Sequence, residues 1–301
     1  MSKSKNAKDL LEMLAGASMT KSMWRPTKSF RPEERWKAAE ANGCLNVRRV
    51  RGQKDLIETR HYAWRAVMSV DRAANYWWNY NTYPYVIEGQ RLYLRENRDM
   101  MKARVEEFDQ EIKKAARQMD ECREELIETS KAEMGEMFDP TLFPTSWEPL
   151  FSIRWIEVNI SPPDWLRSKN EKEYEISFNQ MLASVETSMR VFEQQCFNQM
   201  GDAVSRMMNN LGGPGVRMSN IEAFQKLFNR VQQMKFEGTE VFKHAMAEAK
   251  DIIDGVNVLA MRKDPDLKDQ ATDKLKKLVE RYQELQEAIR NKNRDEEVVE
   301  V

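Results

Sequence analysis

The chain has 301 residues, and its 48 Lys and Arg side chains nearly balance 49 Asp and Glu side chains, which gives a formal net charge of −1. This balance excludes a molecule whose overall charge would attract nucleic acid or an anionic membrane, so any such binding has to be local. The charged fraction of 32% and the mean hydropathy of −0.75 are typical of a protein with much exposed helix surface.

The cysteines and the hydrophobic runs indicate a cytoplasmic protein. Cys44, Cys122 and Cys196 are odd in number, far apart and outside any Cys-x-x-Cys pair, so neither a disulfide framework nor a thiolate zinc site is expected. No run approaches the roughly 18 consecutive apolar residues that a membrane-spanning helix needs. We therefore expect no membrane span.

Residues 1–54 are predicted to form a basic, partly irregular N-terminal arm, because Pro26 and Pro32 interrupt helix formation. The arm combines cations that can neutralise phosphates with aromatic rings that can stack on bases. Its possible contact residues for nucleic acid or a partner are Trp24, Arg25, Lys28, Arg31, Trp36, Arg48, Arg49 and Arg51. The alternative is an arm that wraps the chain's own acidic helices or docks on an acidic partner.

Residues 55–94 are predicted to form a helix and a small aromatic-rich hairpin. Apolar side chains from Asp55 to Trp78 recur at mixed spacings of three and four. Glu88-Gly89 then lies between two β-prone runs, so 83–93 is expected to be the hairpin. The many aromatic rings between Tyr76 and Tyr93 favour a miniature core over a sugar-binding platform.

The strongest pattern is a heptad repeat that predicts a helix from Arg95 to Met137, roughly 60 Å long. Helices patterned in this way bury a narrow stripe against another helix. The second heptad run, from Phe178 to Leu211, is its expected partner, so 95–211 is predicted to be a long helical hairpin interrupted by a strand-like segment near 151–160. The first stripe consists of Met101, Val105, Phe108, Ile112, Ala115, Met119, Cys122, Leu126 and Thr129.

Residues 216–294 are predicted to form C-terminal helices, the first opened by a capping box of Ser219 and Glu222, and 295–301 form a charged tail. The expected fold class is mainly α, with long antiparallel coiled-coil-like helical hairpins and a small mixed α/β body.

No catalytic, cofactor-binding or metal-binding residue is predicted, and no cofactor is expected. His61 and His244 have no second histidine at metal-ligand spacing. The glycine-rich loop 212–215 follows a helix and lacks the Gly-Lys-Ser/Thr of a phosphate-binding loop. Cys122 and Cys196 occupy heptad positions, where a small core residue is the more frequent use. The sequence therefore favours a protein that is not an enzyme.

Part of the chain resembles a known but uncharacterised family. The residues that carry the resemblance are Arg60, Trp64, Thr82-Tyr83-Pro84, Gly89 and Arg91, followed by the long charged helix and the Phe-x-Ile segment at Phe151. Members of this family are encoded in phages, prophages and mobile elements, often beside a MoxR-type AAA+ ATPase and a von Willebrand factor A protein. The resemblance covers roughly residues 55–210. It implies a cytoplasmic protein of a bacterial or phage-infected cell that partners a ring ATPase, and it implies no site residues.

Our leading hypothesis is a non-enzymatic helical scaffold or adaptor, oligomeric or part of an assembly, that recruits a protein partner such as an AAA+ ATPase. The alternative is a nucleic-acid-binding protein that uses the basic aromatic arm. A membrane-active helical protein is a third possibility, based on the stretch from Leu10 to Met19.

Overall fold

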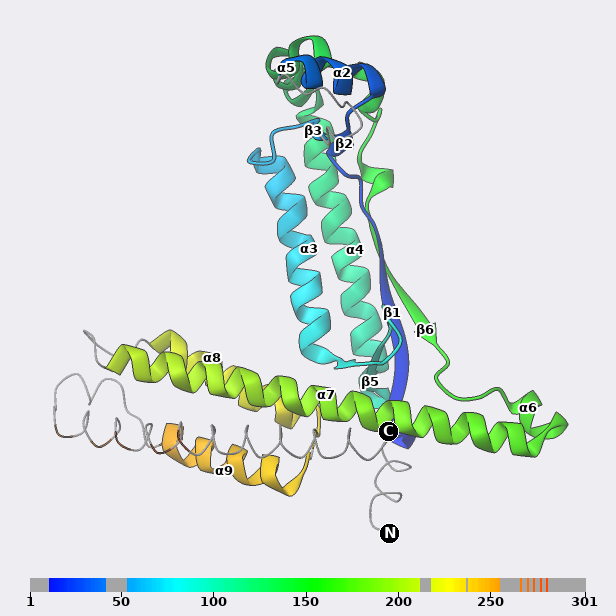
Figure 1. Ribbon diagram of the computed structural model, residues 1–301, viewed down its shortest axis with the longest axis vertical. Coiled ribbons are helices and arrows are strands. Elements are labelled where there is room, and N and C mark those ends of the chain that lie inside the picture. The colour runs from blue at the N-terminus through cyan, green and yellow to red at the C-terminus, as the bar shows by residue number, and fades with distance from the viewer. Residues whose placement is uncertain are drawn as a thin grey trace. The chain divides into compact units, whose positions relative to one another are not determined.

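The computed structural model describes residues 11–41, 53–211, 218–236 and 238–254, together with five separate positions further on. Helices dominate, and short antiparallel strand pairs accompany them (Figure 1), so the predicted class, mainly α with a small α/β body, is confirmed. The chain divides into two compact units. The first unit comprises 1–14, 80–94 and 160–301, and the second comprises 15–79 and 95–159.

In its described residues the second unit contains four strands and four helices. Strand β1 runs antiparallel to β6, with Gly16 opposite Val158 and Ser22 opposite Ser152, and β2 runs antiparallel to β3. The elements are β1 (Leu14–Ser22), β2 (Thr27–Ser29), α2 (Pro32–Ala41), β3 (Gln53–Asp55), α3 (Tyr62–Asn81), α4 (Arg98–Glu121), α5 (Arg123–Met134) and β6 (Ser152–Val158), with short 3-10 turns at Arg95–Asn97, Gly135–Met137, Pro140–Leu142 and Glu148–Leu150.

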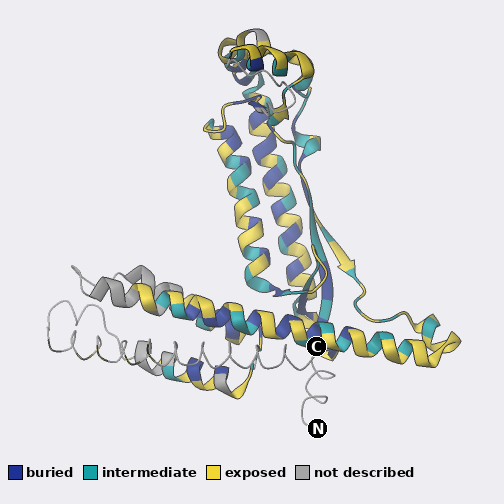
Figure 2. Cartoon of the chain, viewed as in Figure 1, coloured by how far each residue is buried: buried dark blue, intermediate teal, exposed yellow. Residues whose placement is uncertain are grey.

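Helices α3 and α4 form an antiparallel pair (Figure 1). The rings of Trp77 and Phe108 meet edge to face at 5.9 Å, and at the other end the Tyr62 hydroxyl lies 2.7 Å from the Cys122 sulfur. The predicted apolar stripe of α4, from Met101 to Met119, is buried (Figure 2). The single helix expected from Arg95 to Met137 is interrupted, because α4 ends at Glu121 and α5 begins after Cys122.

The helical hairpin expected over 95–211 is not confirmed. In one unit α4 packs on α3 and β6, whereas in the other unit the second heptad helix, α7 (Glu171–Leu211), packs on α8 (Met218–Gln233). Two carboxylates of α4 bind backbone amides in β6 and just before it. Asp109 accepts a hydrogen bond of 2.9 Å from the Ile153 amide, and Asp120 accepts one of 2.6 Å from the Trp147 amide. The predicted strand-like segment near 151–160 is present as β6.

The first unit contains the predicted small hairpin, in which β4 (Tyr83–Pro84) and β5 (Arg91–Leu94) pair antiparallel. Its helices are α6 (Asp164–Lys169), α7 (Glu171–Leu211), α8 (Met218–Gln233) and α9 (Glu240–Asp254). The core between them is aromatic. The Phe192 ring lies 4.9 Å from Tyr83 and 4.9 Å from Phe236, and the Arg230 guanidinium lies 5.1 Å from the same ring.

The segment predicted as an N-terminal arm supplies β1, β2 and α2 to the second unit in its described part. The strand β1 was not predicted, because its conformation depends on pairing with β6, more than a hundred residues away.

Of the predicted C-terminal helices over 216–294, α8 and α9 are present. Beyond Asp254 the described positions Asp266, Gln270, Asp273, Lys277 and Glu280 are helical and exposed. The glycine-rich loop 212–215 and the tail 295–301 lie outside the described residues. Within the described part of the chain, no helix has the length and apolarity needed to cross a membrane.

Candidate anion-binding surface on helix α3

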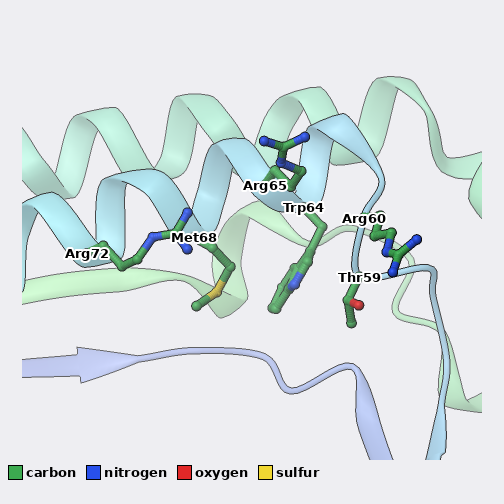
Figure 3. A pocket seen from close by; sticks show the side chains of 6 residues that line it. All are labelled: Thr59, Arg60, Trp64, Arg65, Met68 and Arg72. Carbon is green, nitrogen blue, oxygen red and sulfur yellow. The ribbon is translucent and has the colours of Figure 1, made fainter. Parts of the chain in front are cut away.

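A pocket of about 540 Å³ opens on one side of α3 and the turn that precedes it (Figure 3). Trp64, Met68 and Arg72 follow one another at intervals of four residues, so they project from one side of the helix. In Figure 3 the guanidinium of Arg72 turns toward Met68, and Trp64 lies between Met68 and Thr59. The pocket is lined by Thr59, Arg60, Trp64, Arg65, Met68 and Arg72.

The floor of the pocket is fixed by aromatic packing. Trp64 is only 8% exposed, and its ring meets Trp24 nearly edge-on at 6.3 Å and Phe151 at 6.4 Å. Trp24 also meets the buried ring of Trp147, at 5.8 Å. Edge-to-face aromatic pairs of this kind add to the free energy of burial and restrict ring orientation. The arginines therefore extend from a rigid surface.

The three arginines of the pocket are exposed. Within the described residues, none of their guanidiniums forms an ion pair or a hydrogen bond. The acidic residue of the same helix, Asp71, is already engaged, since the Lys21 ammonium lies 2.5 Å from its carboxylate. Lys21 also donates to the Asn75 side chain at 2.6 Å. Guanidiniums stay protonated in proteins, so this side of α3 carries three positive charges that no described carboxylate neutralises.

The pocket can bind anions but has no described group for proton transfer. Among the described residues that line it, none is a carboxylate, a histidine or a cysteine. Guanidiniums bind carboxylates and phosphates through two parallel hydrogen bonds, and a pocket of this size lies within the range that accommodates small ligands. The arrangement is therefore suited to recognising an oxyanion.

The predicted contact residues of the arm are distributed between internal contacts and the surface. Trp24 belongs to the aromatic floor described above. Arg31 forms ion pairs with Asp139 and Glu34. The side chains of Arg25, Lys28 and Trp36 are exposed, and Arg48, Arg49 and Arg51 lie outside the described residues.

A buried ion pair accompanies the contacts of Arg31. Lys54 is 6% exposed, and its ammonium binds the Glu34 carboxylate and the Met137 carbonyl at 3.0 Å. Burial opposes ionisation of Glu34, but the hydrogen bond from Lys54, the Arg31 amide and the charges of both cations together lower the pKa of Glu34 below its ordinary value. Arg31 is therefore paired within the chain, with Glu34 of the arm itself and with Asp139 of a loop, rather than with one of the acidic helices.

The histidines occupy separate places. His61 precedes α3, where its Nδ1 accepts a 3.3 Å hydrogen bond from the Ala63 amide. His244 is exposed on α9, with Nε2 at 3.2 Å from a Glu248 oxygen. In the part of the chain that the structure describes, no three acidic, histidine or cysteine side chains are grouped to hold a metal ion.

The two described cysteines differ in burial. Cys196 lies in the core of the first unit, and burial raises the pKa of its thiol to about 12, which keeps it protonated and unreactive at neutral pH. Cys122 is half-buried at the break between α4 and α5. Of these two cysteines, therefore, Cys196 is the one that is fully buried in a core.

Sequence reasoning did not find the α3 surface, although a signal is present. Every third or fourth residue of the outer side is polar or aromatic, and all of these side chains are exposed. The prediction of this helix used only the spacing of apolar residues from Asp55 to Trp78 and did not consider the opposite side. This outer stripe consists of Tyr62, Arg65, Ser69, Arg72 and Tyr76.

Comparison of the chain with models of known families, with curated proteins and with solved structures finds no significant match.

Proposed function

We propose that the protein is a non-enzymatic helical scaffold or adaptor that recruits a protein partner. The observation that carries this proposal is the exposure of large apolar side chains on α6 and α7 of the first unit. Trp165 is 60% exposed, Ile176 58% and Val191 43%. Large apolar groups at the surface are a frequent feature of protein-binding sites, and Trp contributes strongly to binding energy where it becomes buried.

The proposed partner is a MoxR-type AAA+ ATPase, on the strength of the family resemblance over roughly residues 55–210. The heptad stripe of α7 is buried within the first unit at Val185, Met189 and Phe192, so association with the partner or with a second copy of the chain would use the exposed Ile176 and Val191 of this helix. The same proposal includes self-association, with coiled-coil pairing through α7. It also includes location in the cytoplasm of a bacterial or phage-infected cell.

The test is direct binding of the purified full-length protein to the purified ATPase, measured by biolayer interferometry, with the oligomeric state measured by light scattering. Replacing Trp165 and Ile176 with Ser is expected to weaken binding at least tenfold, because each buried apolar side chain contributes about 1.5–3 kcal/mol. Trp36→Ser is the matched control, since Trp36 is 66% exposed but belongs to the second unit. A monomer that does not bind the ATPase would contradict the proposal.

A second candidate function is binding of nucleic acid, favoured by the arginines of α3 that have no partner among the described residues and by the exposed Arg25 and Lys28. It predicts affinity for single strands that falls steeply as salt rises. Deleting residues 20–54 is not a suitable test, because this segment includes part of β1 and the Trp24 ring on which Trp64 packs. Substitution of exposed cations leaves these contacts in place.

A further inference from the structure

We propose that the outer side of α3 binds the phosphate groups of single-stranded nucleic acid, with Arg60, Arg65 and Arg72 as the phosphate contacts. This inference rests on the second candidate function and assigns it to a place other than the predicted arm. The carrying observation is that Arg60 in the turn before α3 and Arg65 and Arg72 on α3 have no partner among the described residues, with the exposed Tyr76 on the same helix.

The geometry of α3 matches a ligand with repeated charges. The outer stripe alternates in steps of three and four residues, which keeps its side chains in line along the helix. At about 1.5 Å per residue, Arg65 and Arg72 are separated by about 10 Å and the two tyrosines of the stripe by about 21 Å along the axis. A ligand that carries a single anion would contact only part of this array, whereas an extended polyanion can contact all of it.

The positive charge of this surface is local. Residues 15–79 contain roughly twice as many Lys and Arg as Asp and Glu, whereas Asp and Glu predominate over 95–159. On α4 most cations are held by neighbouring carboxylates, as Arg104 is by Glu107 at 2.6 Å and Glu111 at 3.1 Å. The arginines of α3 have no such partner among the described residues, so they remain available to a phosphate.

Aromatic exposure distinguishes nucleic acid from an acidic protein. Tyr76 is 66% exposed at one end of the outer stripe. The Tyr62 hydroxyl is bound to the Cys122 sulfur of α4 and its ring lies 4.4 Å from the ring of His61, so Tyr76 is the ring assigned to base stacking. Nucleic-acid bases stack on exposed rings, and this stacking requires unpaired bases. An acidic peptide would use the guanidiniums but gain little from the ring. The combination therefore favours a single strand over both a duplex and an acidic protein.

The test is fluorescence anisotropy of a labelled oligothymidylate of about 20 nucleotides, titrated with the full-length protein in about 50 mM salt. The variant R60Q/R65Q/R72Q is expected to bind at least tenfold more weakly. Its slope of log affinity against log salt should be smaller by about 2, since each lost phosphate contact removes about 0.7 from the slope for single strands. Tyr76→Ala should weaken binding at least fivefold, because stacking contributes about 1–3 kcal/mol per base.

Two comparison variants make the result specific. K102Q/K114Q/R117Q removes the same charge from exposed positions of α4 and should bind within about twofold of the unsubstituted chain, because net charge alone has only a weak effect on local contacts. R25Q/K28Q removes two exposed cations of the arm. Circular dichroism of every variant checks that the helix content is unchanged.

The outcomes separate this inference from the function on which it rests. If the unsubstituted protein does not bind the oligonucleotide, nucleic-acid binding itself is wrong. If it binds and only R25Q/K28Q weakens binding, the function stands and the α3 site is wrong. If R60Q/R65Q/R72Q loses affinity for a labelled polyglutamate peptide but keeps its affinity for the oligonucleotide, the surface recognises an acidic protein and the inference is overturned.

Discussion

The second unit contains two groups of basic residues that look alike in sequence and differ in structure. Around α2 and β3, Arg31 and Lys54 are bound by Glu34 and Asp139. On α3, Arg65 and Arg72 have no described partner. The first group makes ion pairs within the fold, and the second is the one to which we assign a ligand. The difference teaches that the density of Lys and Arg in a sequence does not tell which of these cations are paired within the fold.

The largest effect that would sharpen this comparison is expected at Glu34. Glu34→Gln removes the carboxylate partner of a buried ammonium, so it should lower the free energy of unfolding by about 3 kcal/mol, measured by urea denaturation. Glu33→Gln is the control, because Glu33 is exposed in the same turn. Equal stability of the two variants would show that Lys54 does not need its partner.

The two tryptophans of the arm, Trp24 and Trp36, should differ in the same way in how much they contribute to the free energy of unfolding. Trp24→Ala removes a ring that contacts both Trp64 and Trp147, so it should cost about 2 kcal/mol, somewhat less than a fully buried Trp. Trp36→Ala removes an exposed ring and should change the free energy of unfolding by less than about 0.5 kcal/mol. Thermal unfolding followed by circular dichroism measures both. A larger loss for Trp36 would contradict the assignment of Trp24 to the folded core.

The pH dependence of stability gives a smaller effect with a definite sign. The pKa of Glu34 is lowered in the folded state, so the carboxylate contributes stability above its unfolded pKa of about 4.3. That contribution is lost as the pH falls through the lower folded pKa. The stability difference between the unsubstituted chain and Glu34→Gln should therefore be constant near neutral pH and shrink below about pH 4. A difference that grows with acidity would have the wrong sign.

The smallest effect is expected on α3. Arg65→Gln and Arg72→Gln should each change the free energy of unfolding by less than about 0.5 kcal/mol, because neither removes a described interaction. Any change at low salt should be a gain in stability, since like charges repel, and it should disappear as salt screens them. Chemical denaturation at two salt concentrations measures this. A loss of 2 kcal/mol or more would show that these arginines stabilise the fold.

Local patterns in the sequence were sufficient for several elements. The heptad stripe from Met101 to Met119 is buried as predicted. The hairpin over 83–93 also forms, with Gly89 at a φ of 78°, a backbone conformation that glycine adopts without steric cost. Both predictions depend on residues that are neighbours in the chain, which is why they could be made from it.

The partners of these elements could not be predicted, because they depend on contacts distant in sequence. A heptad stripe specifies that one side of α4 is buried, but it does not specify what covers that side. Asp109 and Asp120 carry no signal in the sequence that distinguishes them from solvated carboxylates, yet they bind the amides of Ile153 in β6 and of Trp147 before it. In the same way, Arg31 and Arg72 are distinguishable only once the positions of Glu34, Asp139 and Asp71 are known.

The two aspartates of α4 also bear on the order in which the second unit folds. Asp120 binds the backbone just before β6 and Asp109 binds β6 itself, so the helix alone can set which strand residues face it. A shift by one residue would turn every side chain of the strand to the other side. We therefore expect β6 to adopt its register on α4 before β1 pairs with it. Although β1 comes first in the chain, it would then join the sheet after β6.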